Sequence, residues 1–410
     1  MNSRLPADGI TTLFLDFNSY FASVEQQLRP ELRRRPVAVV PVDTDSTCCI
    51  AASYEAKALG IKTGTNVGEA KRKCADLKIV EARPDVYVRM HHQVVAAVES
   101  CVPVEKVYSI DEMLCKLSGS QCEPAKALEL ARHIKRTIYS QVGEYMRCSI
   151  GLATNRLLAK LATDMQKPDG LVTIALSDLP EKLYGLRLID LPGIGTKMEA
   201  RLLRQGVTTV QQLCSFSETE MHDLWNGIVG VRWYHWLKGE DLYEAPTQRS
   251  SVGHEHVLPP SERNEADARA VIVRLIHKAA ARIRSMEYCA GRMTIWVQHK
   301  PDSDWSVNCA LGSGTDTLEM LAQFGDAWKT RPRLVAYKVG VTLSDIRPTE
   351  TMTQQMFQTD QGRARLGKAM DSLNAKYGKH TLYPASMHTS KGSAPTRIAF
   401  SSIPDPDLAE

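Results

Sequence analysis

The chain reads TLFLDFNSYFASVEQQL from Thr12 to Leu28. Its first six residues are apolar except at Asp16 and at the opening threonine, which is typical of a buried strand. Ser19 can cap the helix that follows, because a serine side chain accepts a hydrogen bond from a free amide of the first turn. A buried strand that ends near a carboxylate and leads into a helix favours an α/β domain.

The same alternation of strand and helix patterns continues on the C-terminal side, to about residue 175. Further strands are expected at 36–42, 106–108, 113–117, 147–152 and 171–174, and helices from Tyr54, from Asn66, at 124–140 and at 155–165. From about Leu179 to Glu240 the strand pattern disappears and short helices dominate. This shift in pattern predicts a boundary between an α/β domain and a helical one.

A second alternation follows a polar linker at 243–250. The expected elements are a strand at 252–258, a helix at 265–286, strands at 292–298 and 305–311, a helix at 317–328 and a strand at 334–343. The order β-α-β-β-α-β is the split ferredoxin-like pattern. After Arg347 the chain is rich in Thr, Gln, Ser and Pro, so we expect partial disorder there, with one short helix near 362–377.

The composition excludes several classes of protein. With 410 residues, 43% of them hydrophobic and 24% charged, the chain is neither disordered nor collagen-like. No segment approaches the roughly 18 apolar residues of a membrane span, and no signal pattern opens the chain. The ten cysteines form no CxxC pair, so they indicate reduced thiols of a cytoplasmic protein. The net charge of +4 permits a nucleic-acid partner without requiring one.

Three carboxylates are candidate metal ligands. Asp16 ends the first strand, and Asp111 and Glu112 lie at a corner between two later strands. Oxygen ligands on rigid supports suit a hard divalent cation, and the carbonyl of Phe17 could add one more. However, an aspartate at a strand end is commonly a turn or cap residue. Adjacent residues of a straight strand also face opposite sides, so Asp111 and Glu112 can share a metal only where the chain bends.

Five ordered stretches resemble motifs of the Y-family DNA polymerases, the translesion enzymes of the DinB and UmuC kind. They are FLDFNSYFASVE at 14–25, ASYEAKALG at 52–60, YSIDE at 108–112, SIGLATNRLLAK at 149–160 and DMQKPDG at 164–170. The resemblance is clear over residues 10–215 and extends in layout to about 345. It implies a multidomain α/β and α+β architecture with four parts and a tail.

These parts have expected boundaries. By the resemblance, a ferredoxin-like palm spans 1–27 and 80–177, small fingers 28–79, a helical helix-hairpin-helix thumb 178–242, a linker 243–250, a β-α-β-β-α-β little finger 251–347 and a C-terminal tail 348–410.

The resemblance also assigns the catalytic residues. It implies that Asp16, Asp111 and Glu112 hold two Mg²⁺ ions, for which Mn²⁺ can substitute, and that the Phe17 carbonyl completes one of the sites. One ion would lower the pKa of the primer 3′-hydroxyl, and the other would neutralise the triphosphate and its leaving pyrophosphate. The reaction is in-line nucleotidyl transfer, which depends mainly on positioning and charge stabilisation.

Three residues match positions that bind the incoming nucleotide in the family. Tyr54 and Lys57 lie three apart on one face of an expected helix, and Lys167 precedes a Pro-Asp-Gly turn that would direct it toward the metals. Without the motifs, each lysine would be taken for a solvated surface charge. Lys57 departs from DinB-like members, which have arginine there, so a point charge replaces a bidentate fork.

Phe21 matches the family's steric gate, an aromatic ring that leaves no room for a ribose 2′-hydroxyl. A structural interpretation competes with this one. Phe17, Phe21, Val24 and Leu28 are spaced at i, i+4, i+7 and i+11, the spacing of an ordinary core stripe on a helix.

Two further segments suggest partners. The stretch LPGIGTK at 191–197 resembles the thumb hairpin, in which Gly193, Gly195 and Lys197 would bind DNA phosphates without reading sequence, although such turns also occur for purely structural reasons. The stretch TQQMF at 353–357 distantly resembles a sliding-clamp-binding motif, in which Met356 and Phe357 would be the docking residues.

The leading hypothesis is therefore a template-directed DNA polymerase that uses primer-template DNA and dNTPs. Small fingers and no recognisable proofreading nuclease imply low-fidelity synthesis past damaged template bases. A non-catalytic DNA- or clamp-binding scaffold is the alternative, and the retained Asp16, Asp111, Glu112 and Lys167 argue against it. A nucleotidyl cyclase-like palm is disfavoured by the thumb-like hairpin and the second α/β unit.

Overall fold

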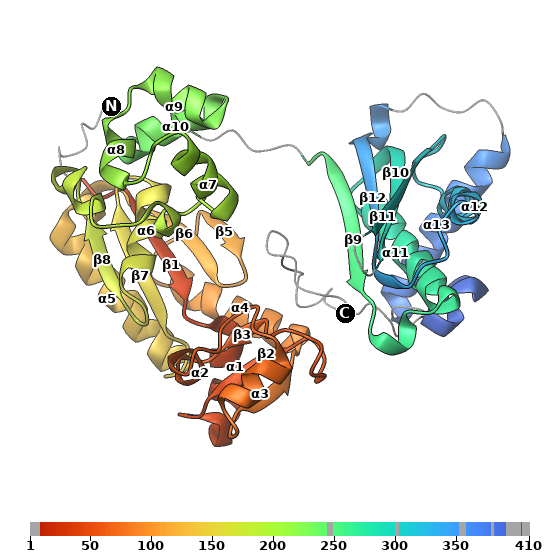
Figure 1. The fold of residues 1–410 in the computed structure, drawn as a ribbon, viewed down its shortest axis with the longest axis horizontal. Helices are drawn as coiled ribbons and strands as arrows, with labels where there is room; N and C mark the ends of the chain where they lie inside the picture. The colour runs from red at the N-terminus through yellow and green to blue at the C-terminus, as the bar shows by residue number, and fades with distance from the viewer. Residues whose placement is uncertain are drawn as a thin grey trace. The chain divides into compact units, whose positions relative to one another are not determined.

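The structure is a computed structural model that describes residues 9–243, 249–299, 303–351, 358–378, 381–390 and 403. Contacts divide the chain into two compact units, residues 1–244 with 397–410 and residues 245–396, each with its own hydrophobic core (Figure 1). Over these described ranges, no helix has both the length and the hydrophobicity to cross a membrane.

The first unit is built around β1 (Thr12–Phe17), the central strand of a five-stranded sheet. The order is β5-β6-β1-β7-β8, with β5 (Lys106–Ser109), β6 (Glu112–Lys116), β7 (Cys148–Ala153) and β8 (Leu171–Ile174). All six residues of β1 are buried, because both faces of the sheet are covered. The predicted buried strand is confirmed.

Successive residues of β1 serve two different cores. Leu13 and Leu15 pack with α4 (Pro84–Glu99) and α5 (Pro124–Gln141) on one face. Phe14 packs with α6 (Arg156–Met165) on the other. This is the alternation that the pleat of a strand requires. Helix α4 was not predicted, although Pro84 at its first turn and its apolar spacing are ordinary signals of a helix start.

Helix α1 (Tyr20–Leu28) follows β1 as expected, but Ser19 does not cap it through its side chain. Ser19 has a left-handed backbone with φ of 51°, and its buried hydroxyl has no hydrogen-bond partner. The helix begins instead with a backbone bond from the Ser23 amide to the Ser19 carbonyl. The tight exit from β1 fixes this geometry, so the predicted cap was wrong.

A smaller three-stranded sheet lies beside α1. Its order is β3-β2-β4, with β2 (Val37–Val40), β3 (Ala51–Ala52) and β4 (Lys78–Glu81). The short helices α2 (Tyr54–Ala58) and α3 (Val67–Lys73) complete a separate small core.

The rest of the first unit is helical. It comprises α7 (Thr196–Arg204), α8 (Val210–Ser215), α9 (Glu218–Trp225) and α10 (Ile228–Leu237). Their apolar residues share one core with α6, so this helical part is packed onto the large sheet. The predicted change from α/β to helical structure is confirmed.

The second unit has the predicted order of elements. It consists of β9 (Ser251–Val257), α11 (Glu265–Ser285), β10 (Tyr288–His299), β11 (Ser303–Ala310), α12 (Thr317–Trp328) and β12 (Ala336–Pro348). The sheet order is β11-β10-β12-β9 and every neighbouring pair is antiparallel. The last strand therefore lies between β9 and β10, as a split βαβ pattern requires.

Part of the tail belongs to this second unit. Helix α13 (Gln358–Tyr377) is longer than the expected short helix, and a 3-10 helix follows at Ala385–Ser390. Arg284 of α11 pairs with Asp371 of α13 at 2.7 Å, and Met387 enters the core with 2% of its surface exposed. These tail segments are thus folded against α11. Met356 and Phe357 lie outside the described residues.

Candidate active site

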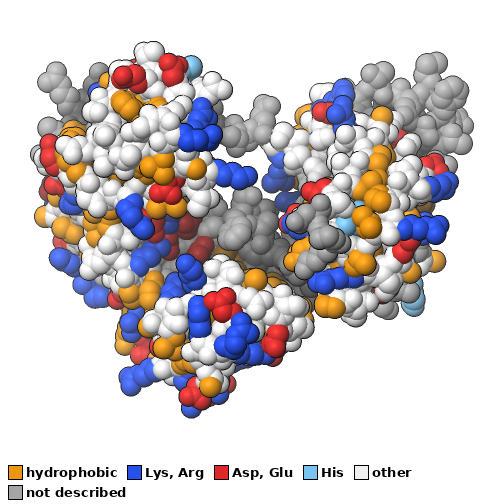
Figure 2. All heavy atoms as spheres, in the orientation of Figure 1, with side chains coloured by type: hydrophobic (Ala, Val, Ile, Leu, Met, Phe, Trp, Pro, Cys, Tyr) orange, Lys and Arg blue, Asp and Glu red, His pale blue; other side chains and the backbone are white. Residues whose placement is uncertain are grey.

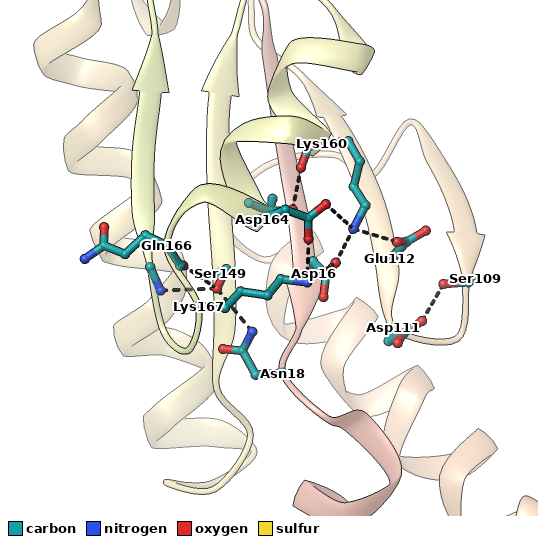
Figure 3. Close-up of polar contacts among 12 residues, drawn as sticks. Asp16, Asn18, Ser109, Asp111, Glu112, Ser149, Lys160, Asp164, Gln166 and Lys167 are labelled. Atoms are coloured by element: carbon teal, nitrogen blue, oxygen red, sulfur yellow. Dashed lines mark hydrogen bonds and ion pairs between the residues drawn. The ribbon is translucent and has the colours of Figure 1, made fainter. Parts of the chain in front are cut away.

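Asp16 of β1 and Glu112 of β6 lie opposite each other on neighbouring strands of the large sheet. They are direct partners in the antiparallel pairing of β1 with β6, which places their side chains on the same side. The ammonium of Lys160 lies between them, 2.9 Å from Glu112 Oε1 and in contact with Asp16 Oδ2 (Figure 3). Two of the three predicted carboxylates therefore converge on one cation.

Asp111 lies at the predicted corner but is turned differently. Ile110 and Asp111 form the turn between β5 and β6, so Asp111 lies outside the ladder that pairs the two strands. The Ser109 hydroxyl donates to Asp111 Oδ1 at 2.5 Å, and Figure 3 shows the Asp111 side chain directed toward Ser109, apart from Glu112. Burial raises the pKa of Asp111, the Ser109 bond opposes this, and the nearby charge of Asp16 adds to it.

Two lysines balance the negative charge of the acidic cluster, which consists of Asp16, Glu112 and Asp164. Lys167 Nζ lies 2.7 Å from Asp16 and 2.8 Å from Asp164, and Lys160 Nζ lies 3.5 Å from Asp164. Burial lowers the pKa of both lysines, but the carboxylates outweigh it, so the pKa of each is raised. Both ammonium groups are therefore charged at neutral pH.

Carboxylate oxygens like those of this cluster are the ligands that a divalent cation prefers, but the carboxylates do not surround a common point. Among the residues described, no group of three or more His, Cys, Asp or Glu side chains is placed to hold a metal ion. The Lys160 ammonium nevertheless shows that a cation fits between Asp16 and Glu112. Figure 2 shows acidic side chains grouped on this part of the first unit, with lysine and arginine side chains around them.

The turn that carries Lys167 is held by buried hydrogen bonds. The Ser149 hydroxyl accepts from Asn18 Nδ2 at 3.1 Å and from the Gly170 amide at 3.2 Å, and donates to the Gln166 carbonyl. The Asp169 amide donates to Asn18 Oδ1 at 2.7 Å. The turn is thereby tied to β7 and to the residue after β1, which directs Lys167 at Asp16.

The position of Lys160 depends on Gly151. A Cβ atom at Gly151 would collide with the Ala159 carbonyl oxygen and press on Ala162. Helix α6 therefore lies directly on the backbone of β7, which only a glycine permits. This close packing sets how far the Lys160 ammonium reaches over the sheet.

Phe21 is partly buried and packs against the core of the first unit. Phe17 and Val24 are buried, but Leu28 is 47% exposed and Phe21 is partly exposed. The Phe21 ring stacks on Tyr87 of α4. Phe21 thus lies at the edge of the core, and its role as the gate stays a prediction.

Helix α2 faces the same cluster. The Lys57 ammonium lies 4.4 Å from the centre of the Tyr54 ring. Burial raises the pKa of Tyr54, and the charge of Lys167 is the next influence, lowering it. Burial lowers the pKa of Lys57, and Lys167 lowers it further. Both side chains therefore lie within electrostatic range of Lys167 and Asp16.

The hairpin of the helical part differs slightly from expectation. Its first helix is a single 3-10 turn at Leu188–Asp190, and its second is α7. Gly193 has φ of 103°, a conformation that favours glycine, and Gly195 is the N-cap of α7. Lys197 is exposed in the first turn of α7, where its charge can meet a phosphate.

No role was predicted from the sequence for Lys160, Asp164 or Ser109. Lys160, Asp164 and Lys167 follow one another at intervals of four and three residues, which places them on one side of α6 and its C-terminal end. That spacing is a usable signal. Ser109 had no comparable signal, because its role depends on the bend at Asp111.

Both the N-terminal and the C-terminal parts of the chain match models of one protein family. Residues 15–164 match the model of the impB/mucB/samB family, and residues 249–356 match that of the impB/mucB/samB family C-terminal domain. The chain is 32% identical to DNA polymerase IV of Moorella thermoacetica, over 93% of this chain and 96% of that protein. It is 26% identical to DNA polymerase IV 2 of Bacillus subtilis, over 94% of this chain and 96% of that protein.

Solved structures share the fold. A Y-family DNA polymerase chimera of Dbh and Dpo4 superposes with a TM-score of 0.69 at 24% identity, covering 82% of this chain and 99% of that one. A ternary complex of Dbh DNA polymerase gives a TM-score of 0.56 at 23% identity, with the same coverage.

Proposed function

The chain belongs to the DinB-like Y-family DNA polymerases, and from that premise we propose that Asp16, Asp111 and Glu112 form its catalytic centre. As a member of this family it is a DNA-directed translesion DNA polymerase, with palm, fingers, thumb and little finger. The scaffold alternative is not favoured.

The observation that carries the proposal is the pairing of Asp16 with Glu112 across one cation. Two carboxylates on adjacent strands would repel each other without a positive charge between them. Lys160 supplies this charge, at 2.9 Å from Glu112. A site that stabilises a cation with carboxylate oxygens on rigid strands suits Mg²⁺.

Asp16, Asp111, Glu112 and the Phe17 carbonyl would hold two Mg²⁺ ions, or Mn²⁺ in their place. Bound there, such ions supply charge that lowers the pKa of the primer 3′-hydroxyl and stabilises the leaving pyrophosphate. Asp111 must then turn from Ser109 toward Asp16. The Ser109 bond holds Asp111 until that exchange of partners, while Lys160 and Lys167 neutralise the remaining carboxylates.

Lys167, Lys57 and Tyr54 would bind the triphosphate of the incoming dNTP. Lys167 is restrained by the turn bonded to Asn18 and Ser149, so its ammonium is pre-positioned. Lys57 and Tyr54 present an ammonium and a hydroxyl from one face of α2. Phe21 would lie beneath the sugar as the steric gate, supported from behind by Tyr87.

The proposed boundaries of the parts of the chain are those predicted from the sequence. The palm is 1–27 and 80–177, the fingers 28–79, the thumb 178–242, the linker 243–250, the little finger 251–347 and the tail 348–410. Gly193, Gly195 and Lys197 would contact the duplex backbone at the N-terminus of α7.

A sliding clamp is proposed as a partner of Met356 and Phe357. Changing both residues to alanine is expected to abolish retention of the polymerase on immobilised clamp while primer extension without clamp stays unchanged. If the variant is retained as well as the wild type, Met356 and Phe357 do not bind the clamp.

Primer extension tests the catalytic centre. Asp111→Asn, Asp16→Asn and Glu112→Gln keep the shape of each side chain and remove its charge, so each is expected to lower the extension rate at least about 100-fold. Asp85→Asn is the matched control, because Asp85 is an exposed carboxylate of α4 paired with Arg89. Activity near that of the wild type in Asp111→Asn would refute the assignment.

A further inference from the structure

His91 of α4 is a buried histidine with a single well-defined bond to the active-site corner. Its side chain is 3% exposed, and Nδ1 lies 2.8 Å from the carbonyl oxygen of Ile110. A carbonyl can only accept, so Nδ1 carries the proton. Burial lowers the pKa of His91 to about 4, so the ring is neutral at pH 7.

The bonded carbonyl belongs to the peptide group that joins Ile110 to Asp111. A peptide group is planar, so a bond to its oxygen also orients the amide of Asp111. The next peptide group is held from the other side, because the Asp111 carbonyl accepts from the Phe17 amide at 2.9 Å. The Cα atom of Asp111 is therefore held between one bond from α4 and one from β1, which sets the direction of its Cβ.

This restraint acts where regular strand pairing does not. Ile110 and Asp111 form the turn that joins β5 to β6, so the ladder between these strands does not define the direction of the Asp111 side chain. Asp111 and Glu112 are adjacent, and they can serve one centre because Asp111 lies in this turn, whereas Glu112 begins the straight strand β6. The His91 bond is made to Ile110, the first residue of the turn.

We propose that His91 is a positioning residue for Asp111, which fixes the Ile110–Asp111 peptide so that the carboxylate can turn from Ser109 into the metal site. The inference rests on the proposed function, in which Asp111 is a metal ligand. An imidazole suits this task. It is rigid, it reaches from α4 to the corner, and in its neutral form it adds no positive charge beside Asp111.

Three substitutions of His91 distinguish the effect of the hydrogen-bond donor's position from the effect of side-chain packing. His91→Phe keeps a ring and removes the donor. His91→Asn places an amide N–H near the position of Nδ1, whereas His91→Gln carries it further out, near the position of Nε2. His92→Phe is the matched control, because His92 is the next residue of α4 and its ring contacts His91 edge to face.

The measurement is Mn²⁺ binding by electron paramagnetic resonance. It uses the full chain with dideoxy-terminated primer-template DNA and a dNTP, so that no turnover occurs. We expect His91→Phe and His91→Gln to weaken Mn²⁺ binding about ten-fold, His91→Asn to restore it to within about three-fold of the wild type, and His92→Phe to bind normally. In primer extension, the half-saturating Mg²⁺ concentration should rise in the same order.

Two results would overturn the inference. The first is normal Mn²⁺ binding by folded His91→Phe. The second is equal loss of Mn²⁺ binding in His91→Asn and His91→Gln. This second result would refute the role of His91 even if His91→Phe does not fold. Asp111→Asn is measured alongside. If that variant binds Mn²⁺ like the wild type, the assignment of Asp111 fails; if it loses binding while the His91 variants do not, only the role of His91 fails.

Discussion

The ring of Phe21 lies against the ring of Tyr87, with centroids 4.5 Å apart and 20° between the planes. The Tyr87 hydroxyl donates to Glu25 at 2.8 Å, and Arg83 donates twice to the same carboxylate, at 2.6 and 3.0 Å. Glu25 is completely buried. Tyr87 is therefore held in place from behind, and it limits how far the Phe21 ring can move toward α4.

Phe21→Ala is expected to admit ribonucleotides. Removal of the ring opens space for a 2′-hydroxyl, and a steric contact of this kind corresponds to about 10- to 200-fold discrimination. The measurement is the ratio of kcat/KM for dNTP over rNTP in single-nucleotide insertion. Leu28→Ala, an exposed change on the same helix, should leave the ratio unchanged. An unaltered ratio in Phe21→Ala would show that the gate lies elsewhere.

Lys160→Met is expected to make stability dependent on divalent cations. The change removes the ammonium that Glu112 contacts, while Lys167 still pairs with Asp16 and Asp164, and the loss of a partner by a partly buried polar group costs about 1–3 kcal/mol. Added Mg²⁺ should then raise the Tm of the variant more than that of the wild type. Thermal unfolding with and without Mg²⁺ tests this, and equal shifts in the two proteins would contradict it.

Gly151→Ala is expected to destabilise the first unit by about 1–3 kcal/mol. The added methyl group would push α6 away from β7 at the Ala159 carbonyl, and Lys160 would move with the helix. Urea unfolding measures the loss of stability. Gly185→Ala is the control, because no heavy atom lies within 4 Å of the position of its Cβ. A neutral effect at Gly151 would mean that α6 does not press on β7.

The Arg284–Asp371 pair is expected to hold α13 on the second unit. The Arg284 side chain is 7% exposed and also donates to the Thr315 carbonyl at 2.9 Å and the Thr317 hydroxyl at 2.8 Å. A double-mutant cycle with Arg284→Met and Asp371→Asn should give a coupling of about 1–3 kcal/mol in the free energy of unfolding. A coupling near zero would show that α13 is held by other contacts.

His254 is expected to make the second unit sensitive to acid. Burial, aided by the charges of Lys278 and Arg282, lowers the pKa of His254 to about 4. The unfolded chain takes up this proton near pH 6.5, so between pH 6.5 and 4 unfolding is favoured as pH falls, by up to about 1 kcal/mol per pH unit. His254→Gln removes the titration. Its free energy of unfolding should fall less steeply than that of the wild type over this window, whereas parallel curves would exclude the effect.

Local patterns predicted most of the elements of both units. The strand at Thr12–Phe17, the helix α5 and the order of the second unit were predicted because their hydrophobic periodicity is carried by contiguous residues. Ser19 was predicted wrongly, since the exit from β1 dictates its backbone. The fold of the tail against α11 was also missed, because its anchors join residues far apart in the sequence, such as Arg284 and Asp371, which are 87 positions apart.

The sequence by itself determined the order of the elements, and it singled out the carboxylates, Lys167 and Phe21 as candidate site residues, because short motifs carry each of them. Only the tertiary structure decided how they meet. Lys160 reaches Asp16 across 144 positions, and His91 reaches the peptide before Asp111 from a helix that was not predicted. The direction of a side chain at a bend depends on hydrogen bonds from elements distant in the sequence, and no local pattern records such bonds.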